Sequence, residues 1–328
     1  MRYTAITVQI LALALAGAAM AAGPGKSRLA AGQSAEGFGS ALMGFVAGEN
    51  GVRGLYGIPG ASRFGEVAPI AGLSAVTVAP GKSFAIGLTG GGARIIDLAS
   101  GAAVDIEGGF AGADRVTFSP SGTAALIEQS GSGAAQLVTG LPDHPAAGGQ
   151  FLLNGAVSWA VSDDGAQVLA ARRDGVWLLT SDGAVPVAHL SDFGALAFAP
   201  GSHEAVVADY GSHAVTLLHP VEGGYAAARL AGAGEGIDSP RYAAFAGTAV
   251  LIASGAAAKL WWVDGTTGAV EPMELPARAS RLDATAYGLF VISAAAGEPA
   301  WLAGRERELR TAVLRAGRGV MCSVPGME

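Results

Sequence analysis

The sequence predicts an all-β protein with the fold of a β-propeller, and three observations support this prediction. First, a segment recurs in variant form at intervals of about 40 residues, the length of one propeller blade. Second, each copy is an apolar alternating run, a turn rich in Pro, Gly, Asp or Ser, and a second apolar run, which is typical of a strand hairpin. Third, the chain contains 51 Gly and 15 Pro in 328 residues, yet the strand periodicity continues between them. These residues therefore mark turns rather than disorder.

The repeated segments define the blades in order. The four clearest copies are AVTVAPGKSFAIG (75–87), RVTFSPSGTAALI (115–127), SWAVSDDGAQVLA (158–170) and ALAFAPGSHEAVV (195–207), and RYAAFAGTAVLIA (241–253) is a weaker fifth. They predict four-stranded units at 71–110, 111–153, 154–191, 192–237 and 238–277, with a sixth at 278–318. In each unit the two middle strands are the most apolar, so we expect them to be the most deeply buried.

The two ends of the chain decide the number of blades. Three strands are expected at 40–47, 52–58 and 63–70, one short of a blade, and a last apolar run at 320–324 can supply the missing strand. Pairing strands from both ends closes the ring and removes two exposed sheet edges. Counting in this way favours seven four-stranded blades, with six as the alternative. The best helix candidate, 304–315, fits an outer strand equally well, and we predict a strand.

The first residues have the pattern of a secretory leader. A basic start at Arg2, an apolar run at 5–16 and the small residues Ala19 and Ala21 predict a signal peptide over 1–21. A Gly/Ala/Ser-rich stretch over 22–37 reads as a flexible tether, and 38–328 as a single β-propeller domain. The expected location is therefore outside the cytoplasm, in the periplasm or at the cell surface and beyond. No later segment has the length and composition of a transmembrane helix, so no membrane span is expected in the mature chain.

Charge and cysteine content narrow the classes of partner. The formal net charge is −7, which disfavours nucleic acid as a partner. Cys322 is the single cysteine, so no intrachain disulfide can form and the fold depends on its apolar core. We expect a monomer.

The third strand of several units carries a resemblance to known repeats. ARIIDLASGAAV (93–104) and AKLWWVDGTTGAV (258–270) contain an alternating strand that ends in Asp-x-x-x-Gly, and this resembles the bacterial YVTN-type β-propeller repeat. The turns at 119–122 and 162–165 resemble those of the WD40-like repeats of TolB-type periplasmic propellers. The resemblance covers 71–277 and departs from true WD40 proteins, because no Trp-Asp pair ends a unit and no Gly-His opens one. It implies an exported or surface propeller, a fold that hosts both binding scaffolds and enzymes.

The sequence contains no recognisable catalytic or metal-binding motif. No Gly-x-Ser-x-Gly nucleophile motif occurs, and Cys322 lies in a short apolar run typical of a buried thiol. The five histidines match no zinc spacing. The sequence therefore predicts no catalytic residue, no metal ligand and no cofactor. A calcium ion in the central channel would suit the fold, but no residue pattern selects its ligands.

Propeller geometry indicates a candidate binding region. The loop between the second and third strand of a blade lies on the same face as the inter-blade loops. In propellers this face usually carries the binding site. Three consecutive units carry functional side chains in that loop: Glu128 and Gln129, then Arg172, Arg173 and Asp174, then Asp209, Tyr210 and His213. We expect them to form one contiguous arc for a polar ligand or a protein, with an ordinary polar rim as the alternative. Two arginines beside carboxylates could hold an acidic group in a bidentate manner.

Trp261 and Trp262 are adjacent in a predicted strand. Adjacent residues of a strand face opposite sides of the sheet, so one Trp should enter an inter-blade core while the other faces the opposite side. A sugar-stacking platform would need exposed, coplanar rings, and the strand geometry argues against it.

The functional prediction follows from these points. We expect an exported, non-enzymatic propeller that binds a protein or a cell-envelope component through one face. The alternative is a metal-dependent propeller hydrolase of the lactonase type. A third alternative is a scaffold subunit of an exported redox complex, which would hold no redox centre itself because the chain lacks a c-type haem motif and a cysteine pair.

Overall fold

The computed structural model describes residues 42–48, 51–58, 61–65, 72–285, 290–293, 301–303 and 309–310. The predicted signal peptide (1–21), the tether (22–37), the closing strand at 320–324 and Cys322 lie outside these residues. No helix within the described ranges has the length and apolar character needed to cross a bilayer.

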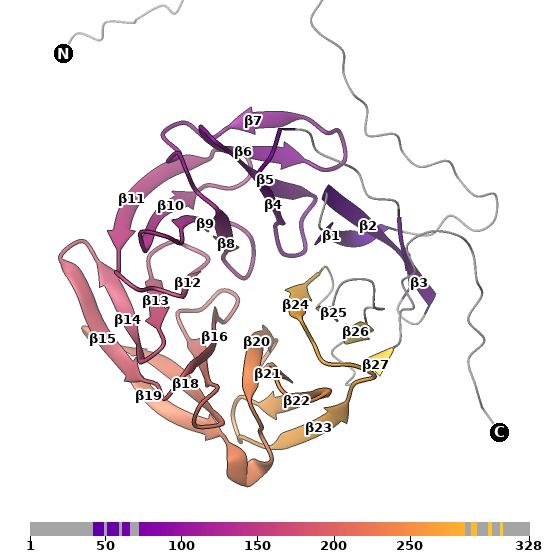
Figure 1. Ribbon diagram of the computed structural model, residues 1–328, viewed down its shortest axis with the longest axis vertical. Helices are drawn as coiled ribbons and strands as arrows, with labels where there is room; N and C mark the ends of the chain where they lie inside the picture. Colours follow the sequence, from indigo (N-terminus) through magenta and orange to yellow (C-terminus); the bar gives the residue numbers. More distant parts are fainter. Residues whose placement is uncertain are drawn as a thin grey trace, which may run out of the picture.

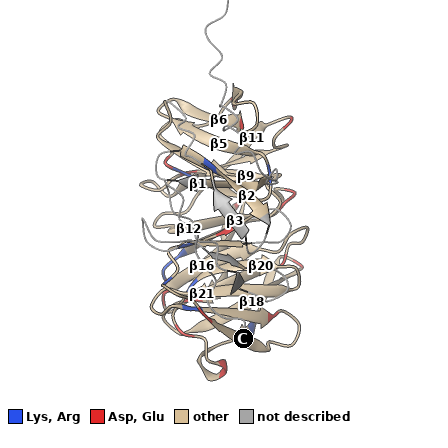
Figure 2. Cartoon of the chain, turned by 90° about the vertical axis from the view of Figure 1, so that its right-hand side faces the viewer, with Lys and Arg blue, Asp and Glu red and all other residues tan. Residues whose placement is uncertain are grey.

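Within these residues, seven antiparallel sheets follow one another in sequence and form a ring around a central axis (Figure 1). The N-terminal sheet contains β1 (Leu42–Gly48), β2 (Gly51–Ile58) and β3 (Ala61–Phe64). The six four-stranded sheets that follow are named here blades 1 to 6. Viewed from its edge, the ring is narrower, and its strands run across this narrow dimension (Figure 2).

The strands of the blades have these bounds. Blade 1 contains β4 (Ala75–Val78), β5 (Phe84–Thr89), β6 (Gly92–Asp97) and β7 (Ala103–Asp105), and blade 2 contains β8 (Arg115–Phe118), β9 (Ala125–Gln129), β10 (Ala134–Thr139) and β11 (Ala146–Leu152). Blade 3 contains β12 (Ser158–Val161), β13 (Val168–Arg172), β14 (Gly175–Thr180) and β15 (Gly183–His189), and blade 4 contains β16 (Phe193–Phe198), β17 (Ala205–Asp209), β18 (Ala214–Val221) and β19 (Gly224–Ala231). Blade 5 contains β20 (Pro240–Ala246), β21 (Ala249–Ser254), β22 (Lys259–Asp264) and β23 (Val270–Glu274), after a short 3₁₀ turn, η1 (Ala233–Glu235). Blade 6 contains β24 (Arg281–Ala284), β25 (Phe290–Ser293), β26 (Trp301–Ala303) and β27 (Leu309–Arg310).

This arrangement confirms the all-β propeller and agrees with seven blades. Each predicted unit corresponds to one observed sheet, and the N-terminal sheet has three strands among the described residues, as the sequence predicts. In each of blades 1 to 6 the first strand lies nearest the axis and the fourth lies at the rim (Figure 1). The segment at 309–310 is a strand, as predicted.

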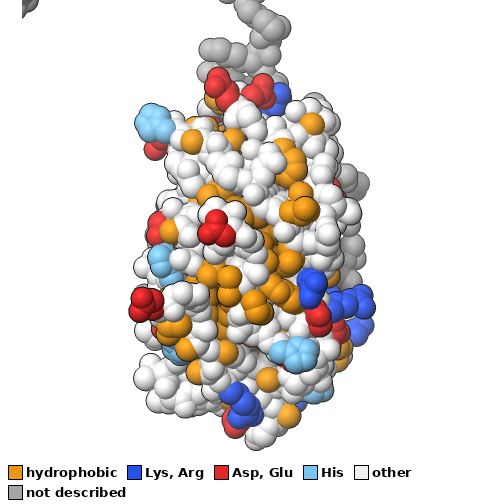
Figure 3. All heavy atoms as spheres, turned by 90° about the vertical axis from the view of Figure 1, so that its left-hand side faces the viewer, with side chains coloured by type: hydrophobic (Ala, Val, Ile, Leu, Met, Phe, Trp, Pro, Cys, Tyr) orange, Lys and Arg blue, Asp and Glu red, His pale blue; other side chains and the backbone are white. Residues whose placement is uncertain are grey.

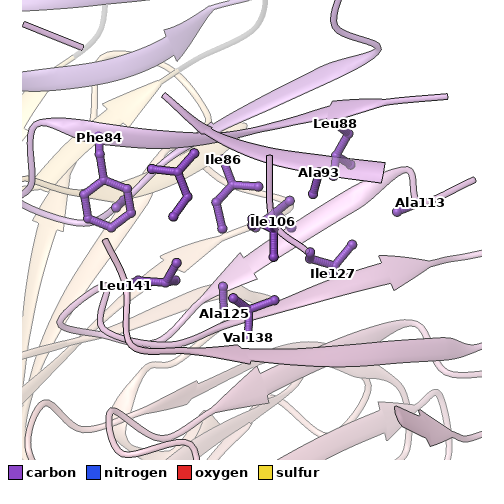
Figure 4. Packing of buried hydrophobic residues seen from close by; sticks show 13 residues of the cluster. Phe84, Ile86, Leu88, Ala93, Ile106, Ala113, Ala125, Ile127, Val138 and Leu141 are labelled. Carbon is purple, nitrogen blue, oxygen red and sulfur yellow. The ribbon is translucent and has the colours of Figure 1, made fainter. Parts of the chain in front are cut away.

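The core lies between the blades, because the apolar middle strands bury both faces. Six clusters of buried side chains each join two neighbouring sheets, from the N-terminal sheet with blade 1 to blade 5 with blade 6. Figure 4 shows the cluster between blades 1 and 2, where Phe84 and Ile86 of β5 face Ile127 of β9 and Val138 of β10. The outer strands are mostly exposed, and they include exposed apolar side chains such as Leu152 of β11 and Val185 of β15. Figure 3 shows apolar side chains gathered on this side of the ring.

The tryptophan pair follows the predicted alternation. Trp261 packs in the cluster between blades 4 and 5, and Trp262 packs in the cluster between blades 5 and 6. They are only 1% and 3% exposed, so neither ring is available for sugar stacking.

The Asp-x-x-x-Gly motif closes the turn between the third and fourth strands. Asp97 Oδ1 accepts hydrogen bonds from the backbone of Ala99 and Ser100, and Gly101 has a φ of 72°. Asp264 and Gly268 repeat this arrangement in blade 5. The Asp side chain satisfies turn N–H groups, while glycine supplies the left-handed backbone.

One carboxylate links three blades through the turns between their first and second strands. Asp163 of blade 3 accepts from the backbone N–H of Ser121 in blade 2 and of Gly201 in blade 4, both at 2.7 Å. Burial alone would raise the pKa of Asp163, but these and related hydrogen bonds outweigh it and lower the pKa. Asp163 occupies the position at which the repeats of blades 1, 2 and 4 have Pro80, Pro120 and Pro200.

Candidate functional site

Two kinds of loop share one face of the ring, which we call the top face. One kind joins the second and third strands within a blade, and the other joins one blade to the next. The inner strand of each blade begins at this face, because it follows an inter-blade loop. The eight residues predicted to bind all lie in or beside loops of the first kind, in blades 2, 3 and 4.

The blade 3 loop presents a fixed arginine. The Arg172 guanidinium lies 4.0 Å from the centre of the Trp177 ring and 3.3 Å from the Asp174 carboxylate. Stacking on an aromatic face and pairing with a carboxylate both restrict the side chain. Arg173 and Asp174 are exposed, so this loop offers charge of both signs to solvent.

The blade 2 loop is different, because its carboxylate is buried. Glu128 is 1% exposed; its carboxyl accepts a hydrogen bond from the Thr117 hydroxyl, and the Arg115 guanidinium lies 3.7 Å away. Burial raises the pKa of Glu128 to about 7, against the lowering effects of Thr117 and Arg115. The neighbouring Gln129 holds its own loop, accepting from Ser132 at 2.8 Å.

The blade 4 loop is organised by Asp209. Its carboxylate, in a residue only 7% exposed, accepts backbone N–H bonds from Ser191, Asp192, Gly211 and Ser212 at 2.8–3.2 Å. Burial favours a higher pKa for Asp209, but the backbone hydrogen bonds prevail and lower it. Asp209 therefore ties its own loop to the inter-blade loop that precedes blade 4.

The remaining two residues of this loop contact the start of blade 5. His213 Nδ1 accepts the backbone N–H of Ser239 at 2.9 Å and lies 3.0 Å from the Asp238 carboxylate. The Tyr210 ring centre lies 5.9 Å from the Arg241 guanidinium carbon. His213 and Ser239 both have positive φ, 54° and 48°, which is uncommon for residues other than glycine.

The three loops lie on the top face, but polar contacts do not join them to one another. Within the described ranges, no hydrogen bond or ion pair joins one of these loops directly to another. Inter-blade loops lie between them: Arg115 donates to the Val157 carbonyl at 3.2 Å, and the Arg172 side chain lies beside Gly155. The contiguous binding arc stays a prediction, with Arg172, Arg173 and Asp174 as its most accessible charged members.

The structure adds a pocket that the sequence analysis missed. We call it the axial pocket; it has a volume of about 320 Å³ and is lined by Ser158, Phe193, Gly194, Ala195, Leu196, Arg241, Tyr242, Ala243 and Leu282. These residues belong to the inner strands β12, β16, β20 and β24, most of them at or near the strand starts, so the pocket lies near the axis on the top-face side. Arg241 donates to the Phe193 carbonyl at 3.0 Å.

A second hollow, of about 300 Å³, lies on the opposite face and has a structural explanation. It is lined by Asp163, Asp164, Gly201, Ser202 and His203. Asp163 bridges the blades, and Asp164 accepts from Ser162 at 2.6 Å and lies 2.8 Å from His203 Nε2. Burial opposes the shift, but these hydrogen bonds lower the pKa of Asp164 to about 2. Both carboxylates are thus already engaged by protein donors.

No group of three or more His, Cys, Asp or Glu side chains within the described part of the chain is placed to hold a metal ion. The three histidines of blade 4 each lie beside a single carboxylate instead, His203 beside Asp164, His213 beside Asp238 and His219 beside Glu204.

Similarity to known proteins is found at the level of the fold. No protein-family model and no curated protein sequence matches the chain. Solved structures do resemble it: a streptogramin B lyase aligns with a TM-score of 0.53 at 12% identity, covering 85% of this chain and 85% of that one. The virginiamycin B lyase from Staphylococcus aureus aligns with a TM-score of 0.55 at 11% identity, covering 74% and 84%.

A third structure, the dihydro-heme d1 dehydrogenase NirN in complex with DHE, aligns at 17% identity over 70% of this chain with a TM-score of 0.46. The chain spans about half of its length, 54%. The lyase structures are β-propeller-like, which agrees with the seven sheets described above. At such identities the likeness concerns the fold and not the activity.

Proposed function

We propose that this chain is an exported β-propeller that binds a protein or a cell-envelope component through its top face, without turnover of its own. The observation that carries the proposal is the fixed Arg172–Trp177 pair, which stands beside the exposed Arg173 and Asp174. Arginine and tryptophan dominate the energetically important positions of protein interfaces.

Arg172 is preorganised for binding. An interface side chain that is already restricted loses less conformational entropy when a partner binds. Arg172 is held by ring stacking and by Asp174 at 3.3 Å, so it can meet an acidic group of a partner at lower entropic cost than a free arginine. Arg173, next in the chain, adds a second positive charge that would attract the same group.

Export and repeat class form part of the same proposal. The basic start, the apolar run at 5–16 and the small residues before position 22 support a cleaved leader. The Asp-x-x-x-Gly turns of blades 1 and 5 support placement among exported repeats that resemble the YVTN and TolB types. N-terminal sequencing of the protein recovered from the periplasm or medium of its host tests the leader, with a new terminus near residue 22 as the expected result.

Partner capture with matched variants tests the binding face. Crosslinking the mature protein in its native envelope, followed by mass spectrometry, should recover a stoichiometric partner. The double variant Arg172→Ala and Arg173→Ala should lose it, whereas Arg94→Ala with Arg229→Ala, which removes two arginines from other positions, should keep it. Equal recovery with both double variants, at normal thermal stability, would overturn the proposal.

The metal-dependent hydrolase expected as an alternative has its own test. Two solved structures of this fold are named as lyases, so the architecture is compatible with enzyme chemistry. An ion that binds only the native state must raise the melting temperature. A shift with Ca²⁺, Mn²⁺ or Zn²⁺ would favour the hydrolase, and unchanged melting with all three would favour the scaffold.

A further inference from the structure

The axial pocket contains a positive charge that no described carboxylate neutralises. Arg241 is exposed, and its contacts within the described residues are the Phe193 carbonyl at 3.0 Å and the Tyr210 ring at 5.9 Å. By contrast, Arg94, Arg172, Arg229 and Arg281 each have a carboxylate oxygen within 3.3 Å. Among the described side chains that line the pocket, Arg241 is the one charged group. The pocket therefore suits an anion.

Two matched β-bulges aim this arginine. The strand register shifts between Phe193 and Ala195 in β16 and between Pro240 and Tyr242 in β20, which leaves Gly194 and Arg241 as the extra residues. A bulge redirects a side chain and is frequent beside functional sites. Gly194 packs against the next blade so closely that a Cβ atom would lie 2.1 Å from the Pro240 carbonyl oxygen. Each bulge thus fixes the position of the other.

Backbone strain is concentrated beside the same strand. Ser239, two residues before Arg241, and His213 both have positive φ, and the Ser239 N–H donates to His213 Nδ1 at 2.9 Å. Such conformations are unfavourable for residues other than glycine and persist where the surroundings fix them. Strained backbone in this position is consistent with a preformed site at the start of β20.

The other lining residues define the shape of a suitable ligand. Phe193, Leu196 and Leu282 give an apolar wall, while the hydroxyls of Ser158 and Tyr242 make no hydrogen bond to another described residue. A volume of about 320 Å³ lies at the lower end of the range for small-molecule sites. The pocket is thus small, cationic on one side and apolar on another.

We propose that the axial pocket binds a small organic acid, with its carboxylate on Arg241 and a compact apolar body against Phe193, Leu196 and Leu282. A guanidinium holds a carboxylate through charge-assisted and often paired hydrogen bonds, which gives both attraction and orientation. None of the lining residues belongs to the blade 2 to blade 4 loops proposed to bind a partner. The Tyr210 ring of the blade 4 loop lies 5.9 Å from the Arg241 guanidinium carbon, so the two proposed sites are adjacent and are tested with different variants.

Calorimetric titration of the full mature chain with phenylacetate tests the proposal. Two comparison ligands separate charge from shape. Phenylacetamide has the same phenyl group without the negative charge, and inorganic phosphate has negative charge without the phenyl group. Phenylacetate should bind at least tenfold more tightly than either one. This acid–amide comparison uses the unaltered protein, so it stands even if a variant fails to fold.

The matched variants are Arg241→Gln and Arg94→Gln, the second of which removes an arginine from β6, the third strand of blade 1. Arg241→Gln should weaken phenylacetate at least tenfold and leave phenylacetamide unchanged, whereas Arg94→Gln should change neither. Absence of phenylacetate binding up to about 10 mM, equal affinity for the amide, or binding insensitive to Arg241→Gln would overturn the proposal. Partner capture is tested with variants of Arg172 and Arg173 instead, so either proposal can be overturned while the other stands.

Discussion

At the scale of single residues, Glu128 is a carboxyl that the fold prefers to keep protonated. It is 1% exposed, and burial raises its pKa from 4.5 to about 7. The folded state therefore binds this proton more tightly than the unfolded chain does. The stability that this group contributes is fully present below pH 4.5 and is lost as the pH rises through about 7.

The variant Glu128→Gln should remove this pH dependence. Because the amide does not ionise, we expect the variant to gain stability relative to wild type between pH 4.5 and 7.5, by up to about 3 kcal/mol. Urea unfolding across this range measures the difference. Glu107→Gln, at an exposed position, should show a wild-type profile, and parallel profiles for Glu128→Gln and wild type would contradict the prediction.

Asp209 has the opposite behaviour, because the fold prefers its ionised form. Four backbone N–H groups donate to its carboxylate and lower its pKa below 3.8. Asp209→Ala should cost about 2 kcal/mol of unfolding free energy at pH 7, since it leaves these donors without their acceptor.

The stability deficit of Asp209→Ala should depend on pH. The contribution of Asp209 is present above pH 3.8 and is lost as the pH falls through its lower folded pKa. The deficit of the variant should therefore shrink in acid. Asp143→Asn, at an exposed site without a side-chain hydrogen bond in the described contacts, should match wild type throughout; a deficit that is constant down to pH 2 would contradict the argument.

At the scale of elements, the paired bulges of β16 and β20 depend on one glycine. Gly194→Ala would place a methyl group 2.1 Å from the Pro240 carbonyl oxygen, so one strand must move. We expect a loss of about 1–3 kcal/mol in unfolding free energy, together with weaker phenylacetate binding.

A second glycine gives the control for this prediction. A Cβ atom at Gly149 in β11 would have no other atom within 4 Å, so Gly149→Ala should change the stability by less than about 0.5 kcal/mol. If both variants unfolded at the same denaturant concentration, the close approach of β16 to β20 would have no energetic significance.

The strands could be predicted because their signal is local. Alternation of apolar residues and the Pro/Gly/Asp turns fix each hairpin without reference to its neighbours, so blades 1 to 6 follow the predicted units closely. Glu128 offered a further clue, because it lies two residues after the fully buried Leu126 and hence on the same side of β9.

The axial pocket could not be predicted in this way. Arg241 looks like an ordinary charged residue at a strand start, and Gly194 like an ordinary strand glycine. Their roles come from the contact between β16 and β20, which are 47 residues apart and belong to different repeats. A one-residue shift in register that depends on a neighbouring blade does not show in the apolar periodicity of either strand's sequence.

At the scale of the whole molecule, the shared cores predict cooperative unfolding. Each cluster belongs to two sheets, so the loss of one blade exposes apolar surface on both of its neighbours. Trp159 reports on the interface of blades 2 and 3, and Trp262 on that of blades 5 and 6.

Variants that keep one or the other of these tryptophans, with the rest replaced by Phe, should therefore unfold in urea with coincident midpoints. Coincidence of transitions seen by different probes is the standard test of two-state behaviour. Separate midpoints would show that the two sides of the ring unfold independently.

The bridge made by Asp163 bears on how such a ring can change in evolution. Where every interface between neighbouring repeats is equivalent, one repeat can be added or deleted without changing the contacts of the others. Here the turn of one repeat is bonded to the turns before and after it, at a position where three other repeats carry proline. Copying any of those proline-bearing repeats into this place would remove both bonds. Blades 2 to 4 therefore depend on one another for these contacts. We expect related proteins to retain or lack these three blades together.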